Sequence, residues 1–228
     1  MSMALSELAP PRARVERRSR LRRLLGGGTD GNEQLTAVAG VILLVLFAVL
    51  GVTILFIGND KMLWLHLFLG TLLVGPVALK LASTGYRFTR YYLSNPAYKR
   101  KGPPPLLMRM LGPFVILTTL GVFFTGLLLL VDGPGAGNLV REAHKLFFFA
   151  WLVVVGIHVL WHLAELPAGV RAVRNAEGRN RDLPGSLRRG IALFVAIACG
   201  VVLALIFLPD IHSWTNGLAY HPYRLHLG

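Results

Sequence analysis

Five long apolar runs constrain the fold of this chain more than any other feature of its sequence. The hydrocarbon core of a bilayer is about 30 Å thick, and a helix needs about 20 residues to cross it. The runs are Leu35–Ile57, Met62–Leu81, Leu107–Val131, Leu146–Leu166, whose helix we expect to begin near Val140, and Ile191–Leu208. They lack the short alternating pattern of β-barrel strands. The sequence therefore predicts an all-α integral membrane bundle of about five transmembrane helices.

Composition agrees with a lipid bilayer as the solvent of this chain. Of its 228 residues, 54% are hydrophobic and 15% are charged, against roughly 25% charged residues in an ordinary soluble domain. The predicted organisation is a basic cytoplasmic arm at 1–34, a four-helix core at 35–166, a basic cytoplasmic loop at 167–190, a fifth helix at 191–208 and an extracytoplasmic tail at 209–228. This length leaves no room for a large soluble domain.

The net charge of +13 indicates membrane topology, and we expect no nucleic-acid partner, because most basic residues flank the apolar runs. Nineteen Lys and Arg residues fall in the arm, in 82–109 and in 167–190. Only Lys61, Arg141, Lys145 and Arg224 fall on the opposite side. The positive-inside rule then predicts a multi-pass cell (inner) membrane protein with its N-terminus in the cytoplasm and its C-terminus outside.

Residues 82–109 and Cys199 allow two further predictions. The stretch 82–109 contains five aromatic residues suited to the headgroup layer and is predicted to form an ordered interfacial loop, in which Pro103-Pro104-Pro105 excludes helix until Leu106. Cys199 is the single cysteine, so the chain has no disulfide framework and no C-x-x-C-H for covalent haem attachment. We expect Cys199 to be a small buried apolar residue.

The four-helix core is predicted to consist of two repeated hairpins. Gly51-Val52-Thr53 near the end of the first helix corresponds to Gly121-Val122 in the third, and an outside turn follows each. After its turn, the second helix of the first hairpin opens with Trp64-Leu65-His66, and the second helix of the other hairpin opens with Ala143-His144-Lys145. His66 therefore corresponds to His144, and Lys80, fourteen residues on, corresponds to His158.

The histidines of the second and fourth helices are the candidate ligands, because ionisable residues inside a membrane default to a functional interpretation. A fourteen-residue step leaves His144 and His158 only about 40° apart in direction and about 21 Å apart along the helix, with His162 on the same stripe. Haem iron takes axial ligands from two facing helices, and His66 and His144 lie at comparable depth. We predict that they ligate a haem.

Nearby residues fit this prediction. Gly70, one turn from His66, opens a surface that a flat macrocycle could approach, while Lys61, Arg141 and Lys145 are near enough in sequence to meet haem propionates. The alternative is that both histidines are amphipathic residues of the interface and bind nothing. Gly70 would then be a close helix-packing residue.

Three interpretations remain open at the inner end. In the first, a second haem uses His158 or His162 together with Lys80 as an unusual neutral amine ligand. In the second, a quinone or a proton path occupies the cluster. In the third, Lys80 extends to the inner headgroups while Trp161 and His162 are interfacial. We expect the last, and one haem rather than two. In the tail, the spacing of His212, His221 and His226 fits no compact metal site. We expect the tail to lie over the outer haem edge or against a partner.

Two histidine motifs carry a resemblance to a known family. They are Trp64-Leu65-His66-Leu67-Phe68-Leu69-Gly70 and His144-Lys145-Leu146-Phe147-Phe148-Phe149-Ala150-Trp151, which continues to His158-Val159-Leu160-Trp161-His162. Over residues 35–166 the chain resembles the membrane b-type cytochromes of hydrogenases, formate dehydrogenases and molybdopterin oxidoreductases. The resemblance implies low-spin haem b and electron transfer between a quinone and an extracytoplasmic redox partner. The chain departs from this family at Lys80, where the resemblance leads us to expect a second inner haem ligand.

The leading hypothesis is thus an electron-transfer subunit with no catalytic residue of its own, part of an oxidoreductase complex and dependent on a redox partner protein in or outside the membrane. The rival hypothesis is a cofactor-free membrane scaffold or small transporter, in which the histidines are interfacial or relay protons.

Overall fold

The structure is a computed structural model that describes residues 28–93, 105–163 and 186–215. Within those ranges it contains six helices and no strand, namely α3 (Gly28–Leu55), α4 (Asp60–Tyr92), α6 (Leu106–Asp132), α7 (Asn138–Leu163), α9 (Ser186–Ile206) and α10 (Leu208–Thr215). The first five are long and apolar enough to cross a membrane. The predicted all-α architecture with five membrane-spanning helices is confirmed at this level.

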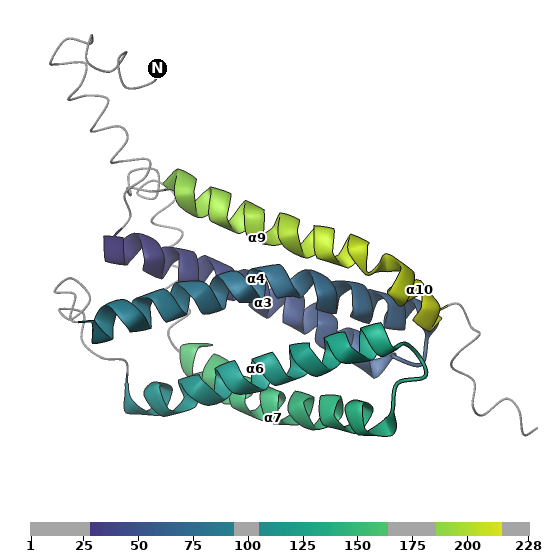
Figure 1. The fold of residues 1–228 in the computed structure, drawn as a ribbon. Coiled ribbons are helices and arrows are strands. Elements are labelled where there is room, and N and C mark those ends of the chain that lie inside the picture. The colour runs from purple at the N-terminus through teal and green to yellow at the C-terminus, as the bar shows by residue number, and fades with distance from the viewer. Residues whose placement is uncertain (1–27, 94–104, 164–185, 216–228) are drawn as a thin grey trace, which may run out of the picture.

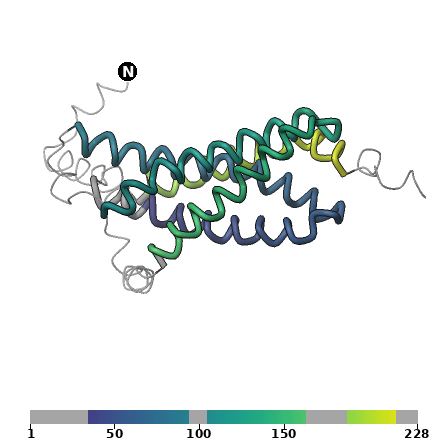
Figure 2. Tube along the Cα trace, turned by 90° about the horizontal axis from the view of Figure 1, so that it is seen from below, coloured from purple at the N-terminus to yellow at the C-terminus, as the bar shows by residue number. Residues whose placement is uncertain are grey.

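The five long helices run side by side, and the short α10 lies at the end of the bundle opposite the start of α3 (Figures 1 and 2). α3 packs against α4, α6 packs against α7, and α9 packs along α4. α10 closes the end of the bundle against α4 and α6. The chain is therefore built from two hairpins, α3–α4 and α6–α7, with α9 added to the first.

α4 is longer than its apolar run predicts. It begins after Asn59, whose side chain accepts a hydrogen bond from the Lys61 backbone N–H (2.9 Å), and continues to Tyr92. The prediction of an interfacial loop is therefore wrong for residues 82–92, where no proline interrupts the helix. Residues 94–104 of that predicted loop lie outside the described residues. α6 begins at Leu106 directly after Pro105, as the three prolines predict.

The chain after α9 contains a helix where the sequence predicts only a tail. In α10, Ile211 is fully buried and Trp214 is 8% exposed. Both pack on Leu130 of α6 and on apolar residues at the start of α4. The signal for this helix is the Ile211–Trp214 spacing of three, which places both side chains on one face. His221 and His226 lie outside the described residues, and His212 is exposed.

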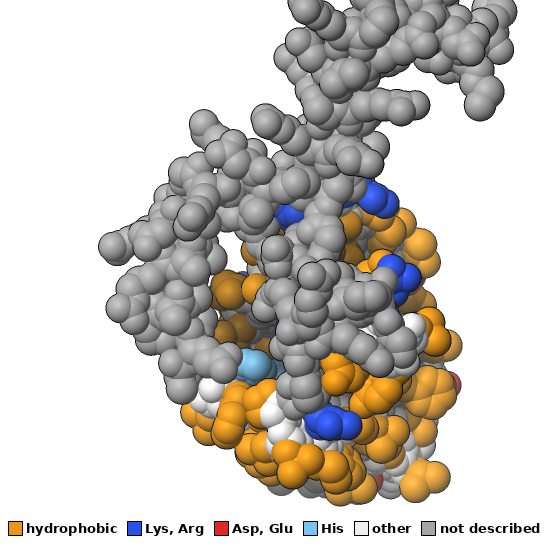
Figure 3. Space-filling model, turned by 90° about the vertical axis from the view of Figure 1, so that its left-hand side faces the viewer, with side chains coloured by type: hydrophobic (Ala, Val, Ile, Leu, Met, Phe, Trp, Pro, Cys, Tyr) orange, Lys and Arg blue, Asp and Glu red, His pale blue; other side chains and the backbone are white. Residues whose placement is uncertain are grey.

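Large hydrophobic side chains cover the outside of the bundle, among them Val45, Phe124, Phe149 and Phe194, each more than half exposed. Figure 3, a view along the bundle toward the end where α3 begins, shows hydrophobic side chains over most of the described surface with Lys and Arg among them. Such a surface suits lipid chains as the surrounding medium. Cys199 belongs to this outer surface, so the prediction that it is buried is wrong.

The contact between α4 and α9 depends on two glycines. A Cβ atom on Gly75 would lie 2.0 Å from the Ala196 carbonyl oxygen, and a Cβ on Gly200 would lie 2.1 Å from the Leu72 carbonyl oxygen. Pro76 has no backbone N–H to offer Leu72, so this carbonyl is free to face Gly200. Hydrogens on the two glycine Cα atoms thus point at carbonyl oxygens, an arrangement that stabilises close helix pairs.

Candidate functional site

His66 on α4 is held by a threonine of the preceding helix. Its Nδ1 lies 2.9 Å from Oγ1 of Thr53 on α3, and Thr53 is 2% exposed. The Thr53 hydroxyl also lies 2.5 Å from the Leu50 carbonyl oxygen of its own helix. The side chain of His66 is therefore oriented from within the α3–α4 hairpin.

His144 on α7 has the same arrangement in the other hairpin. Its Nδ1 lies 3.0 Å from Oγ1 of Thr125 on α6, a residue that is 6% exposed. The Thr125 hydroxyl donates to the Gly121 carbonyl oxygen (2.7 Å). Gly126 leaves room for the ring, because a Cβ there would lie 3.1 Å from Cε1 of His144.

These hydrogen bonds determine which ring nitrogen is free. A threonine hydroxyl has one hydrogen and two lone pairs. Because the hydroxyls of Thr53 and Thr125 can each give their hydrogen to a backbone carbonyl, the contacts favour the tautomer in which each hydroxyl accepts from the imidazole Nδ1–H. In that tautomer Nε2 of His66 and of His144 carries a lone pair, and no side-chain hydrogen bond to either Nε2 occurs in the part of the chain that the structure describes. This is the tautomer of a histidine that binds a metal through Nε2.

The repeated contact refines the predicted internal repeat. Carbonyl oxygens of Leu50 and Val122 also lie close to the His66 and His144 rings, three residues before the respective threonines. Thr53 thus matches Thr125, which shifts the alignment by two residues from the Gly-Val match that the sequence indicates. The correspondence of His66 with His144 is unchanged.

The two histidines come near one another across the bundle. They are close enough for their charges to interact, yet α4 and α7 make few direct contacts. A Cβ on Gly70 would meet nothing within 4 Å among the described residues. Gly70 is therefore not a close-packing residue, and the α4 surface one turn from His66 is open.

Two of the three basic residues expected near haem propionates, Arg141 and Lys145, have other contacts. Arg141 donates from Nη2 to the Pro134 carbonyl oxygen in the α6–α7 turn, and its guanidinium lies 5.8 Å from the centre of the Trp214 ring. Lys145 forms an exposed ion pair with Glu142 at 2.7 Å. Arg141 thus joins the outer turn to α10, whereas Lys145 points away from the buried part of the bundle.

The inner residues form a second group. Nζ of Lys80 donates to the Thr36 carbonyl oxygen on α3 (2.6 Å), so this side chain crosses to the neighbouring helix. An ammonium that donates to a carbonyl has no lone pair for iron. His158 contacts the exposed His162 edge-on with ring centres 4.7 Å apart. Trp161 is 41% exposed, in keeping with an interfacial residue.

An aromatic cluster lies between the two groups, and its role in the bundle is not evident from the sequence. Trp151 on α7 donates from Nε1 to Thr119 on α6 (3.1 Å) and its ring lies 4.9 Å from that of Phe47 on α3. Phe123 of α6 lies edge-on to Phe47 at 6.5 Å. Trp151 is seven residues from both His144 and His158, so the cluster fills the middle of the bundle between them.

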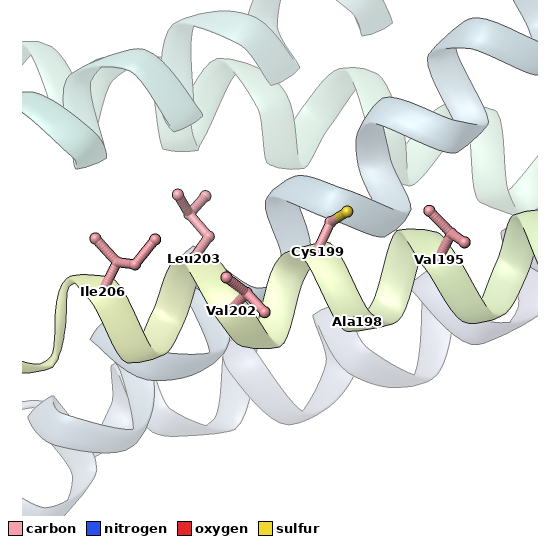
Figure 4. A pocket seen from close by; sticks show the side chains of 6 residues that line it. All are labelled: Val195, Ala198, Cys199, Val202, Leu203 and Ile206. Atoms are coloured by element: carbon pink, nitrogen blue, oxygen red, sulfur yellow. The ribbon is translucent and has the colours of Figure 1, made fainter.

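A shallow groove of about 290 Å³ lies on the surface of α9 (Figure 4). It is lined by apolar or small side chains alone, namely Val195, Ala198, Cys199, Val202, Leu203 and Ile206. Because the groove offers no charged or hydroxyl group, it is a surface for hydrocarbon and not a site for chemistry.

The described residues contain no cluster of three or more His, Cys, Asp or Glu that could hold a metal ion by itself. A metal would have to bring further ligands of its own, as a macrocycle does. No family model, curated protein or solved structure matches this chain. The site must therefore be interpreted from its own chemistry.

Proposed function

We propose that this chain is a membrane electron-transfer subunit that holds one non-covalent haem b between α4 and α7, with His66 and His144 as axial ligands. The observation that carries the proposal is the repeated Thr–His contact, in which Nδ1 of each ring lies within hydrogen-bonding distance of a buried threonine hydroxyl and Nε2 is left as the candidate metal ligand. Bound haem would supply one-electron chemistry at its iron. The chain would be the cytochrome subunit of an oxidoreductase complex, with no catalytic activity of its own.

The surroundings support a flat, apolar group at this position. The two imidazoles come from different helices, as the opposite faces of a macrocycle require, and those helices make few direct contacts with one another. Gly70 leaves the α4 surface open beside His66. Thr53 and Thr125 act as second-sphere partners, which orient ligand histidines and raise their basicity.

The position of His66 and His144 in the bundle indicates where redox partners would bind. His66 and His144 lie toward the end of the bundle closed by α10, the end expected outside the cell. Electrons would pass between a quinone or another membrane pool and a partner protein at the extracytoplasmic side or in the membrane. Arg141, which ties the α6–α7 turn to Trp214, belongs to the surface that such a partner would meet.

A visible spectrum of the purified protein, oxidised in air and then reduced, tests the proposal. We expect reduced b-type absorption bands and one haem per chain. His66→Ala and His144→Ala should each abolish those bands, because a bis-imidazole site needs both ligands. His212→Ala is the matched control, since His212 is an exposed histidine of α10, and should leave the bands unchanged. Full wild-type spectra in both ligand variants would favour the cofactor-free scaffold or transporter.

A further inference from the structure

The ammonium group of Lys80 has more hydrogens to donate than the described protein groups accept. Its Nζ makes one hydrogen bond in the described structure, to the Thr36 carbonyl oxygen. An ammonium group has three hydrogens to donate, so two remain for another acceptor. Gly40 on α3 provides the space for this group, because a Cβ there would lie 3.0 Å from Nζ.

Two further groups converge on Lys80. Arg87, two turns along α4, and His158 on α7 both lie close enough to Lys80 for their charges to interact. Nδ1 of His158 is buried and has no hydrogen-bond partner among the residues that the structure describes. None of these three side chains forms an ion pair with a carboxylate in the described ranges. The result is a group of donors from two helices with no counter-ion.

The depth of this group matches a phospholipid phosphate. Lys80 lies twenty residues after Asp60, or about 30 Å along the helix, which is about the thickness of the hydrocarbon core. Arg87 lies about 10 Å further, beside the exposed aromatic rings of Tyr86, Phe88 and Tyr92. Aromatic and basic side chains of this kind mark the headgroup layer. Figure 3 shows Lys and Arg side chains and a histidine among hydrophobic ones at this end.

We propose that Lys80, Arg87 and His158 bind the phosphate of an anionic phospholipid from the adjoining leaflet. Phosphate oxygens accept charge-assisted hydrogen bonds from Lys and Arg and can accept a further one from an imidazole N–H. Such a ligand would satisfy the unpaired donors, and basic pockets between transmembrane helices bind lipid headgroups in this way. The lipid chains would lie along the exposed apolar surfaces of α4 and α7.

Native mass spectrometry of the detergent-solubilised full chain, titrated with phosphatidylglycerol or phosphatidylcholine, tests this site. We expect one tightly bound phosphatidylglycerol and much weaker retention of phosphatidylcholine. Arg87→Gln and Lys80→Gln should each weaken phosphatidylglycerol binding about fivefold. Lys145→Gln removes the same charge at the opposite end of the bundle and is the matched control. It should leave the affinity unchanged.

A second variant distinguishes a loss of lipid binding from a loss of folding. Lys80→Arg keeps the charge and the donors and should retain phosphatidylglycerol. Equal binding of the two lipids, unchanged affinity in Arg87→Gln, or displacement of the lipid by inorganic phosphate at the lipid's own concentration would each overturn the proposal. Recovery of a quinone that is lost in Lys80→Gln, without selective lipid binding, would also overturn it. The haem spectrum is measured separately, so failure of this site and failure of the haem proposal are distinguishable.

Discussion

At the scale of single residues, the central feature is a threonine hydroxyl placed between a backbone carbonyl and an imidazole. Thr71 and Thr118 donate to carbonyls of their own helices in the same way, and such bonds are ordinary for threonine in a helix. Thr53 and Thr125 differ because their remaining lone pair meets a histidine of the next helix. Each thereby selects the tautomer and the orientation of one ring.

Replacing these hydroxyls tests that role. Thr53→Val and Thr125→Val leave the Nδ1–H of the facing histidine without its hydroxyl acceptor. We expect each change to weaken haem retention by about 10- to 100-fold and to move the haem midpoint potential to more positive values, because the imidazole becomes a poorer electron donor. Haem titration of the apo-protein and a redox titration measure the two effects.

The control for these variants is Thr118→Val on α6. Thr118 is 8% exposed and donates to the Phe114 carbonyl, but it does not hydrogen-bond to a histidine. Its replacement should leave both the affinity and the potential unchanged. Equal shifts in Thr118→Val and Thr125→Val would mean that buried threonines affect haem binding through general stability alone.

The sequence predicted the histidines of the candidate site but not the side chains that orient them. His66 and His144 stand out because ionisable residues are rare in apolar helices. Thr53 and Thr125 do not, because they lie thirteen and nineteen residues from their histidines, and only the packing of each hairpin brings them together. The acceptor of Lys80 on α3 lies 44 residues away, so the sequence gives no signal for that hydrogen bond either.

At the scale of the helices, α4 is the element on which the others depend. It contacts α3, α9, α10 and α6, and its fully buried Leu73 and Pro76 lie at the centre of these contacts. Pro76 would be unfavourable in an isolated helix because it removes one backbone hydrogen bond. Here the released carbonyl of Leu72 faces Gly200, so the cost is offset at the contact with α9.

The close α4–α9 contact predicts an asymmetric response to alanine. Gly200→Ala places a methyl group against the backbone of α4 and should lower the free energy of unfolding by roughly 1–3 kcal/mol. Gly51→Ala on α3 meets nothing within 4 Å and should be neutral or stabilising, because alanine is the better helix former. Unfolding in mixed detergent micelles compares the two. A similar loss in both variants would contradict the role assigned to this contact.

Helix number was predictable and helix ends were not. The length of an apolar run indicates which part of a helix lies in lipid, and the sequence identifies this part for all five helices. The extension of α4 to Tyr92 and the whole of α10 lie beyond the apolar runs. There, stability comes from contacts with other elements, such as Trp214 packing on α4 and α6, and apolar length gives no signal for them.

At the scale of the whole molecule, charge separates the two ends of the bundle. Among the described residues, Arg87, Arg90, Arg109, Arg188 and Arg189 lie where α4 ends and where α6 and α9 begin, at the end where Asp30 and Glu33 stand in the first turns of α3. The opposite end carries Asp60, Asp132, Glu142 and Asp210 together with Lys61, Arg141 and Lys145. This separation agrees with the cytoplasmic assignment that we propose for the arginine-rich end.

Thiol labelling tests this orientation. In a Cys199→Ala background, Ser213→Cys on α10 should react with a membrane-impermeant maleimide added to intact cells, because Ser213 is exposed at the end expected outside. Thr89→Cys, exposed on the extension of α4, should react only after the membrane is permeabilised. The reverse pattern would invert the topology and place the histidine pair near the cytoplasm.

The hydrogen bond to each candidate ligand histidine is contained within one hairpin, Thr53 with His66 in α3–α4 and Thr125 with His144 in α6–α7. Each hairpin contains both partners of its hydrogen bond, so each imidazole can be oriented before the two hairpins pack against one another. The candidate site is then two preassembled half-sites, and lateral association of the hairpins sets only their separation. Two fragments divided within residues 94–104, produced together in one membrane, should therefore reconstitute it.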